Sequence, residues 1–195
     1  MPGAAGADVR ARRGGQRGSG AGKWDGRPQV RWYGRRVPQP EVLAAINADV
    51  WTPFADGYAT GDAERYLAVH AGDFVRVDAD ADWVGGLEAY AADVRRFFGR
   101  LAERGDQARI AFRFVERLAD AGIASERGVY RLVFSVSDGT ERIFHGAFHT
   151  LARRTDAGWR LFVDYNTSAG GTAEAFDAAR AVDDLAAFGP APATG

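Results

Sequence analysis

Two histidines lie four residues apart in a segment that has the pattern of a β-strand. His145 and His149 fall within residues 141–154, where their even spacing places both rings on one face of the strand. Imidazole changes its charge near neutral pH, so the two rings suit proton transfer. Four strand residues span about 13 Å, which is too far for both rings to bind one metal ion. The spacing therefore predicts acid–base chemistry, with histidines hydrogen-bonded inside a sheet as the alternative.

Two glutamates interrupt apolar strand faces. Glu116 falls in a row with Phe112 and Phe114, and Glu126 shares a face with Tyr130. A carboxylate in such a place must be paired, protonated or in contact with a wet cavity. Each glutamate is therefore either a pocket acid with a raised pKa or the partner of a neighbouring arginine in a salt bridge at the rim.

A third candidate carboxylate ends a strand-like run. Asp78 is the last residue of the segment 73–78 (DFVRVD). A pocket lined by Trp83, Tyr90 and Phe98 would desolvate this carboxyl, raise its pKa and make it a better base near neutral pH. The alternative is a turn carboxylate that accepts hydrogen bonds from backbone amides, which is a common use of aspartate.

The composition is that of one folded domain without thiol chemistry. The chain has 195 residues, of which 46% are hydrophobic and 12% aromatic, so a sizeable core is expected. It has no cysteine, which excludes disulfides, thiol nucleophiles and cysteine-ligated metals. No apolar run is long enough for a membrane span, and no apolar stretch follows the basic N-terminal residues as in a signal peptide. We therefore expect a cytoplasmic protein that does not contact membranes.

The first 40 residues differ in charge from the rest of the chain. They hold nine Lys or Arg and two Asp, whereas residues 41–195 hold 16 basic and 24 acidic side chains. Many glycines and few aliphatic side chains cannot bury enough surface for folding, so residues 1–39 are predicted to be a disordered basic tail. Such a tail would bind nucleic acid only weakly, by charge and by stacking on Trp24 or Trp32. The alternatives are a solvated extension and a start codon set too early, with initiation at a residue such as Val37.

Helices are predicted ahead of the long strands. Pro40 suits the first turn of a helix whose apolar face recurs at every fourth residue, and Pro53 should kink or restart that helix. Asp62 is the expected N-cap of a short second helix, and the glycines at 85–86 open a third, which Gly105 ends. The apolar face of the first helix consists of Val42, Ile46, Val50 and Phe54.

Strand patterns dominate the second half of the chain. Apolar and polar side chains alternate there, as in half-buried strands, and short turn sequences join the runs, so an antiparallel meander is expected. The predicted strands cover residues 107–119, 123–137, 141–154 and 158–167. Residues 171–195 are predicted to form a C-terminal helix over 173–188 and a frayed tail.

This order of elements indicates an α+β fold, in which a curved antiparallel sheet wraps the N-terminal helices and leaves a pocket at its open end. The second face of the sheet is not clearly polar, since Val129 and Val133 lie opposite Tyr130. A sheet that is apolar on both sides needs a cover. We therefore expect a homodimer packed through the outer face.

Three stretches resemble the NTF2-like superfamily, which has the cone-shaped fold of ketosteroid isomerase, scytalone dehydratase and the SnoaL-like polyketide cyclases. They are residues 54–62 (FADGYATGD), 72–78 (GDFVRVD) and 146–166, which runs from GAFHTLARR to WRLFVDYN. The last stretch is most similar to the DUF4440 or SnoaL-like subgroup. The resemblance places the domain at residues 40–170.

The resemblance implies that Asp78 is the general base, which moves a proton between carbons of a bound ketone. In ketosteroid isomerases two donors also stabilise the developing oxyanion. The matching positions here hold Phe54 and Ala147, neither of which can donate a hydrogen bond. Tyr58, one helical turn later, could substitute, but steroid isomerisation itself is not expected.

The ligand is expected to be a small apolar or aromatic molecule, because many rings are available to line one small cone. Asp164 and Asn166 match polar positions of the SnoaL-like pattern and are expected at the pocket mouth, or else in hydrogen bonds at the strand end. The candidate ligand-binding residues are Phe54, Tyr58, Trp83, Tyr90, Phe98, Phe112, Phe114, Glu116, Glu126, Tyr130, Asp164 and Asn166.

Two functions agree with these residues. The first is a cofactor-independent isomerase, cyclase or dehydratase, with Asp78 as base and His149 or His145 as its partner and with no metal. The second is a non-catalytic module for ligand binding or dimerisation. The two differ in whether titratable groups converge on the pocket.

Overall fold

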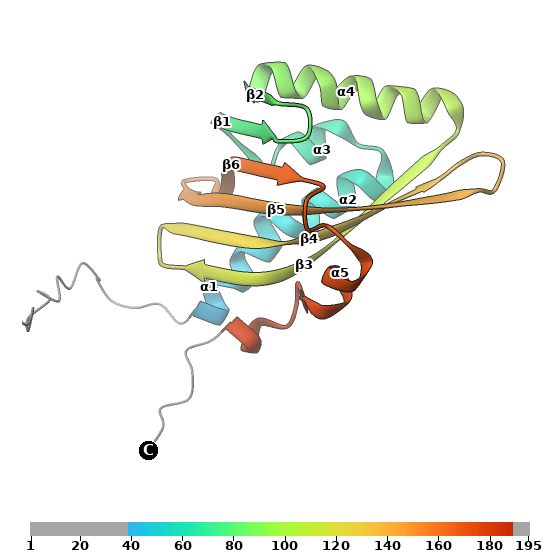
Figure 1. The fold of residues 1–195 in the computed structure, drawn as a ribbon. Coiled ribbons are helices and arrows are strands. Elements are labelled where there is room, and N and C mark those ends of the chain that lie inside the picture. The colour runs from blue at the N-terminus through green and yellow to red at the C-terminus, as the bar shows by residue number, and fades with distance from the viewer. Residues whose placement is uncertain (1–38, 189–195) are drawn as a thin grey trace, which may run out of the picture. The chain divides into compact units, whose positions relative to one another are not determined.

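The computed structural model describes residues 39–188, which form helices packed on a curved, unclosed sheet (Figure 1). The predicted basic tail over residues 1–39 lies outside the described residues apart from Gln39, and so does the predicted tail from residue 189 onward. None of the helices in the described part of the chain is long and apolar enough to cross a membrane.

A π-helical turn interrupts the first helical stretch near Pro53, where a kink or restart was predicted. Helix α1 (Gln39–Ile46) passes into η1 (Asn47–Trp51) and then into α2 (Thr52–Thr60). Pro53 has no N–H with which to continue the regular ladder, and the N–H of Thr52 bonds the carbonyl of Asn47, five residues back. The predicted apolar face is confirmed, because all four of its residues are buried, and the π-turn brings Trp51 to the same side.

Two further helices follow the predicted signals. Helix α3 (Ala63–Leu67) begins after Asp62, whose carboxylate accepts hydrogen bonds from two backbone N–H groups of the first turn. Helix α4 (Leu87–Arg104) ends at Gly105, which has the left-handed φ of 69° that glycine tolerates best. Both helices, with α2, lie on the concave side of the sheet (Figure 1).

The predicted antiparallel meander is confirmed as the centre of a seven-stranded sheet. Its order is β2-β1-β6-β5-β4-β3-β7, and every neighbouring pair is antiparallel except β1 and β6. The strands are β1 (His70–Asp78), β2 (Trp83–Gly86), β3 (Gln107–Ala119), β4 (Ile123–Ser135), β5 (Glu141–Thr155), β6 (Gly158–Thr167) and β7 (Arg180–Ala181).

A β-bulge changes which side chains of β3 point inward. The register to β4 shifts between Phe114 and Glu116, so the alternation restarts one residue later. Val115 is 64% exposed at the bulge, while Arg117 is only 1% exposed. The prediction that Glu116 continues the inward row after Phe114 is therefore wrong, and Arg117 takes the inward place.

The single C-terminal helix predicted over 173–188 is also wrong. Helix α5 (Ala173–Ala178) is short, and the chain then pairs with β3 through β7 before a 3₁₀ turn, η2 (Leu185–Phe188). The helix ends where Ala179 becomes extended and the chain turns to pair with β3, while the ring of Phe176 packs under the guanidinium groups of Arg113 and Arg131. Helix α5 thus covers part of the outer face of the sheet, on the side away from α2 (Figure 1).

Candidate functional site

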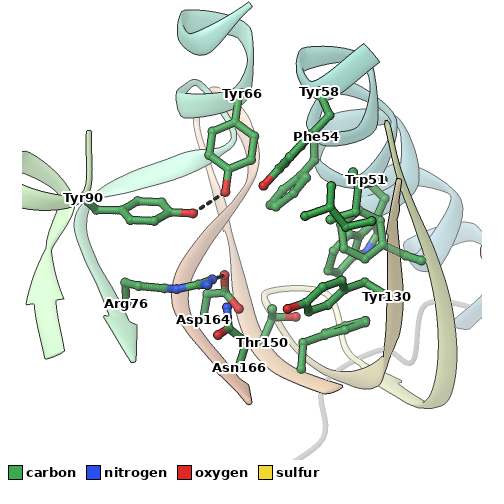
Figure 2. Close-up of a pocket in the computed structure, with 14 residues that line it drawn as sticks. Trp51, Phe54, Tyr58, Tyr66, Arg76, Tyr90, Tyr130, Thr150, Asp164 and Asn166 are labelled. Atoms are coloured by element: carbon green, nitrogen blue, oxygen red, sulfur yellow. Dashed lines mark hydrogen bonds and ion pairs between the residues drawn. The ribbon is translucent and has the colours of Figure 1, made fainter. Parts of the chain in front are cut away.

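A cavity opens between the concave face of the sheet and helices α2, α3 and α4 (Figure 2). It encloses about 490 Å³ when the solvent at its mouth is counted, and about 80 Å³ of this is open to the centres of water molecules. These dimensions suit a small molecule and not a polymer segment. The lining residues are Trp51, Phe54, Tyr58, Tyr66, Arg76, Tyr90, Ile110, Phe112, Tyr130, Leu132, Phe148, Thr150, Asp164 and Asn166.

One half of the cavity is aromatic. The ring centroid of Trp51 lies 4.8 Å from that of Phe112 and 5.4 Å from that of Phe148. Phe54 and Tyr58 are stacked, with an interplanar angle of 13° and centroids 6.0 Å apart. These rings come from four elements and hold one another in place, so they present a rigid apolar wall.

Two glycines of the sheet make room for this wall. Gly128 is paired with Phe148 across β4 and β5, and Gly146 is paired with Tyr130. A Cβ at Gly128 would lie 2.7 Å from Cζ of Phe148, and one at Gly146 would lie 2.4 Å from the hydroxyl of Tyr130. Both rings therefore lie across the neighbouring strand at positions where only glycine leaves space.

The other half of the cavity is polar. Arg76 of β1 forms an ion pair with Asp164, its partner in the parallel β1–β6 ladder. The hydroxyls of Tyr66 and Tyr90 are hydrogen-bonded to each other, and the guanidinium of Arg76 lies 5.4 Å from the ring centroid of Tyr90. Figure 2 shows these groups facing the aromatic wall across the cavity, with Asn166 beside Asp164.

Burial moves the titration of the cavity phenols further above neutral pH. It raises the pKa of Tyr58, Tyr66, Tyr90 and Tyr130, and the positive charge of Arg76 only partly opposes this rise. For Arg76, burial alone would lower the pKa, but the facing carboxylate of Asp164 and the tyrosines raise it overall. At neutral pH the cavity therefore offers several hydroxyl donors and a charged guanidinium.

A second polar network supports the aromatic wall from behind. The indole N–H of Trp51 donates to Glu126 over 2.9 Å, and Arg117 donates to the other carboxylate oxygen over 2.6 Å. Arg117 also donates to the Asn47 side chain and to the carbonyl of Val182. Burial raises the pKa of Glu126, and Arg117 opposes the rise. The network fixes Trp51, whose ring forms the cavity floor.

His70 lies directly behind the two hydrogen-bonded tyrosines. Its ring packs against Tyr66, Tyr90 and Phe74, with centroids 5.3, 5.6 and 4.4 Å away. Nδ1 donates to the carbonyl of Leu67, so Nε2 carries the lone pair, and among the described residues it is the one buried side-chain nitrogen or oxygen without a partner. Burial lowers the pKa of His70 to about 4.

Many of the predicted ligand-binding residues meet in this cavity. Aromatic and polar candidates from five different elements are among its lining residues, although the sequence separates them by more than 100 positions. They are Phe54, Tyr58, Tyr90, Phe112, Tyr130, Asp164 and Asn166.

Five other ligand-binding candidates lie elsewhere. Trp83 packs on its own edge strand over Gly85, and Phe98 and Phe114 are core residues behind the lining. Glu116 forms a half-exposed salt bridge with Arg127, and Glu126 is fully buried against Arg117, so neither carboxylate faces the cavity. The bulge in β3 explains why the side chain of Glu116 does not face the cavity.

Asp78 is not a lining residue. Its carboxylate accepts hydrogen bonds from the N–H groups of Asp80 and Ala81, which is the turn alternative given above. Its charge still reaches the cavity, since it contributes to the raised pKa of Tyr90 and Tyr130. The carboxylate that lines the cavity is Asp164.

The two histidines share a face, as predicted, but it is the outer one. His149 forms a hydrogen bond of 2.9 Å with the hydroxyl of Ser125, and His145 packs against Phe176 of α5. Phe148 and Thr150, between and beyond them on β5, line the cavity from the other face. The structure therefore does not bring the histidines together with a cavity carboxylate. Within residues 39–188, no three His, Asp or Glu side chains converge as metal ligands do.

Sequence reasoning missed Arg76 and Tyr66 as site residues. Arg76 is two residues before Asp78, and strand alternation places the two on one face with Phe74, so the pattern contained a signal for it. Tyr66 lies on the buried side of α3 and was indistinguishable from a core residue. Trp51 lies in the π-turn and outside the row of every fourth residue that predicted the apolar face, so the pattern did not point to it.

Comparison with known proteins supports the fold. No family model matches the chain, and no curated protein matches its sequence. An NTF2-like protein with a cystatin-like fold from Novosphingobium aromaticivorans is 22% identical, with 69% of this chain and 86% of that chain covered and a TM-score of 0.54. An NTF2-like protein of unknown function from Pseudomonas putida KT2440 is 16% identical, with 67% and 89% covered and a TM-score of 0.53.

A third solved structure matches the fold of this chain to a similar extent. It is an NTF2-like protein of unknown function from Shewanella oneidensis MR-1, 13% identical, with 63% of this chain and 96% of that chain covered and a TM-score of 0.51. The identities are low, so the likeness concerns the fold and not the activity. The part of residues 39–188 that aligns with them thus has the α+β fold of these NTF2-like proteins, which is the predicted fold class.

Proposed function

We propose that this protein binds a small, uncharged molecule with an apolar or aromatic body and one oxygen function. The observation that carries the proposal is the division of one cavity into an aromatic half and a half lined by hydroxyl donors. The body of the ligand packs against the wall that Trp51, Phe112 and Phe148 form. Its oxygen accepts hydrogen bonds from the tyrosine side.

The charge balance favours an uncharged ligand. Arg76 already has an anionic partner in Asp164, and the two side chains are only 15% and 5% exposed. A ligand anion placed beside Arg76 would meet the carboxylate of Asp164 at short range, at a cost that rises in a low-dielectric cavity. A carbonyl or phenol oxygen accepts a hydrogen bond without bringing a charge, and the buried phenols supply the donor.

Binding of 4-methylphenol, compared with the anion 4-methylbenzoate, tests this proposal. We expect the phenol to bind and the benzoate to bind at least tenfold more weakly, as measured by calorimetry at pH 7. Tyr130→Phe should weaken phenol binding about fivefold to tenfold, because one hydrogen bond contributes about 1 kcal/mol. Tyr165→Phe is the matched control, since Tyr165 is exposed and outside the cavity. Equal binding of the anion, or an equal effect of both substitutions, would contradict the proposal.

A second candidate function is proton transfer on such a ligand. A carboxylate that is 5% exposed, Asp164, lines the same cavity as the tyrosine hydroxyls, which supplies a base and oxyanion donors to one ligand. Asp164 would take a proton from the carbon beside a carbonyl, the electron pair would move to the carbonyl oxygen, and a tyrosine would donate to that oxygen. This cofactor-independent step transfers to Asp164 the role that the sequence resemblance gave to Asp78, and it is a step of the isomerase and cyclase chemistry of SnoaL-like proteins.

Deuterium exchange into 2-tetralone in D₂O, followed by NMR, tests the second candidate. We expect exchange above the background rate, its loss in Asp164→Asn and its retention in Asp78→Asn. Because the tetralone carries its own acidic C–H bonds, the assay needs no knowledge of the natural substrate. If exchange depends on Asp78 and not on Asp164, the general base is Asp78 and the second candidate function as proposed is contradicted.

We also propose that two copies associate through the outer face of the sheet. Helix α5 covers the middle of that face, but apolar side chains around it stay exposed. Those of highest exposure near the β3–β4 hairpin are Val115 (64%), Leu118 (54%) and Ile123 (50%). A dimer would cover them. A monomer mass in light scattering at micromolar concentration, or an unchanged mass of Leu118→Lys, would contradict this proposal.

A further inference from the structure

We infer that the ring of Tyr58 is a partition between two hollows and sets the greatest length of ligand that the cavity accepts. The inference rests on the proposed function, since it concerns the same cavity, and it adds the class of ligand that is selected. In the wild-type protein the ligand is compact, and one with a linear apolar tail is excluded.

A second hollow lies behind the cavity, between the ends of α2 and α4 and the start of β3. It offers about 190 Å³ to the centres of water molecules, compared with about 80 Å³ in the cavity. Its lining residues are Tyr58, Ala59, Thr60, Gly61, Phe98, Leu101, Ala102, Asp106, Gln107 and Ala108. A Cβ at Gly61 would meet no atom within 4 Å, so the hollow opens to solvent at the end of α2.

Tyr58 is the residue that both hollows share. Among the residues that line either of them, no other appears on both sides, so one aromatic ring separates the two spaces. The α4 side of the second hollow is apolar, with Phe98, Leu101 and Ala102 along it. A hydrocarbon chain that passed the ring would therefore continue over apolar surface.

The ring is fixed by its neighbours. Its centroid lies 5.4 Å from that of Tyr66, 5.3 Å from Phe98 and 6.0 Å from each of Phe54 and Phe97. Four aromatic contacts hold the ring in place between the two hollows. Within residues 39–188 no group is hydrogen-bonded to the Tyr58 hydroxyl, so the ring itself, and not a polar contact, closes the passage.

A series of 4-alkylphenols from methyl to octyl, titrated calorimetrically, tests the partition. In the wild type we expect affinity to rise over the first members and then fall. In Tyr58→Ala we expect it to keep rising by about fourfold for each further methylene group that is buried. Tyr58→Leu should give an intermediate cut-off, and it retains enough side chain to support the fold if Tyr58→Ala unfolds.

Two further variants locate the effect. Tyr58→Phe keeps the ring and should keep the wild-type cut-off, whatever happens to the affinity of the short members. Ala102→Phe fills the second hollow, so in the Tyr58→Ala protein it should restore the short cut-off. These results would show that the ring closes the passage and that the tail occupies the hollow behind it.

The outcomes separate the inference from the proposed function. If the short phenols bind and the cut-off is the same in the wild type, Tyr58→Leu and Tyr58→Ala, the inference is overturned while the proposed function stands. A wild type that binds the octyl member better than the methyl member also overturns it. If no member binds to any of the proteins, the proposed function fails, and the inference fails with it.

Discussion

Two buried ion pairs of this protein differ in their surroundings. Arg117 and Glu126, behind the cavity floor, are 0% exposed, and their N–O distance is 2.6 Å. The remaining donors and acceptors of this pair are occupied by Asn47, Val182 and the indole of Trp51. Its hydrogen bonds close on groups of the protein itself.

The ion pair in the cavity is partly accessible to solvent, and we call it the open pair. Arg76 and Asp164 retain 15% and 5% exposure, and among the described residues no protein group is bonded to the nearby hydroxyls of Tyr58 and Tyr130. Unused donors beside a charged pair have a cost unless water or a ligand meets them. The comparison indicates that the closed pair serves the fold and that the open pair is available to a ligand.

The closed pair gives the largest expected effect. Glu126→Gln leaves the guanidinium of Arg117 buried without an anion, so we expect the free energy of unfolding to fall by about 3–5 kcal/mol. Urea denaturation measures this value. The loss is global, because Asn47 and Trp51 of η1 and Phe188 of η2 all contact the same network.

Glu116→Gln is the matched control for that substitution. Glu116 is paired with Arg127, but the two side chains are 40% and 54% exposed. We expect a change below about 1 kcal/mol, as is usual for exposed pairs. Equal losses in the two variants would remove the distinction between a closed and an open environment on which the comparison rests.

His70 gives the second largest effect, which depends on pH. Its pKa is about 4 in the folded protein and 6.5 in an unfolded chain, so the unfolded state binds the proton first as the pH falls. The associated stability is present above pH 6.5 and is lost between pH 6.5 and 4, by about 3 kcal/mol. His70→Phe should lack this loss, as measured by thermal and urea unfolding across that range. The same slope in both proteins would show that Nε2 is not buried without a partner.

Much of the fold could be predicted because its signals are local. The turn sequences between the strands, the N-cap at Asp62 and the glycine at 105 act within a few residues, and each produced the expected element. The bulge at Val115 and the break after α5 depend on contacts with β4 and β3, far away in the sequence. No local pattern contains those contacts.

The site was harder to predict than the fold. Alternation placed His145 and His149 on one face of β5, but both faces are apolar, so the pattern could not say which one is inside. The role of Arg76 depends on Asp164, 88 residues later in the chain, because an arginine stays buried only with a partner. The predicted rings reached the cavity because any large apolar side chain on the concave face contributes to its wall.

Asp164→Asn tests the ion pair that is open to the cavity. It leaves Arg76 without its anion, as Glu126→Gln does for Arg117, but water can reach the cavity pair. We expect the free energy of unfolding to fall by about 1–2 kcal/mol, which is clearly less than for the closed pair. Because the arginine is then free, 4-methylbenzoate should bind better than it does to the wild type. A loss as large as that of Glu126→Gln would show that the two pairs are equally closed.

The smallest expected change in stability concerns Gly146, which leaves room for the ring of Tyr130 at the cavity. A Cβ there would lie 2.4 Å from the Tyr130 hydroxyl, so in Gly146→Ala the ring must turn away. The ring borders the open cavity and can move, so we expect a stability loss below about 1 kcal/mol. The hydroxyl would nevertheless leave its place, and 4-methylphenol should bind severalfold more weakly in calorimetry.

Gly99→Ala is the control variant. Gly99 is exposed on α4 with no atom near its Cβ, so the substitution should stabilise the protein by about 0.5–1 kcal/mol without changing the affinity for 4-methylphenol. Unchanged phenol affinity in Gly146→Ala would mean that Tyr130 does not contact the ligand, and the donor side of the cavity would then be confined to Tyr58, Tyr66 and Tyr90.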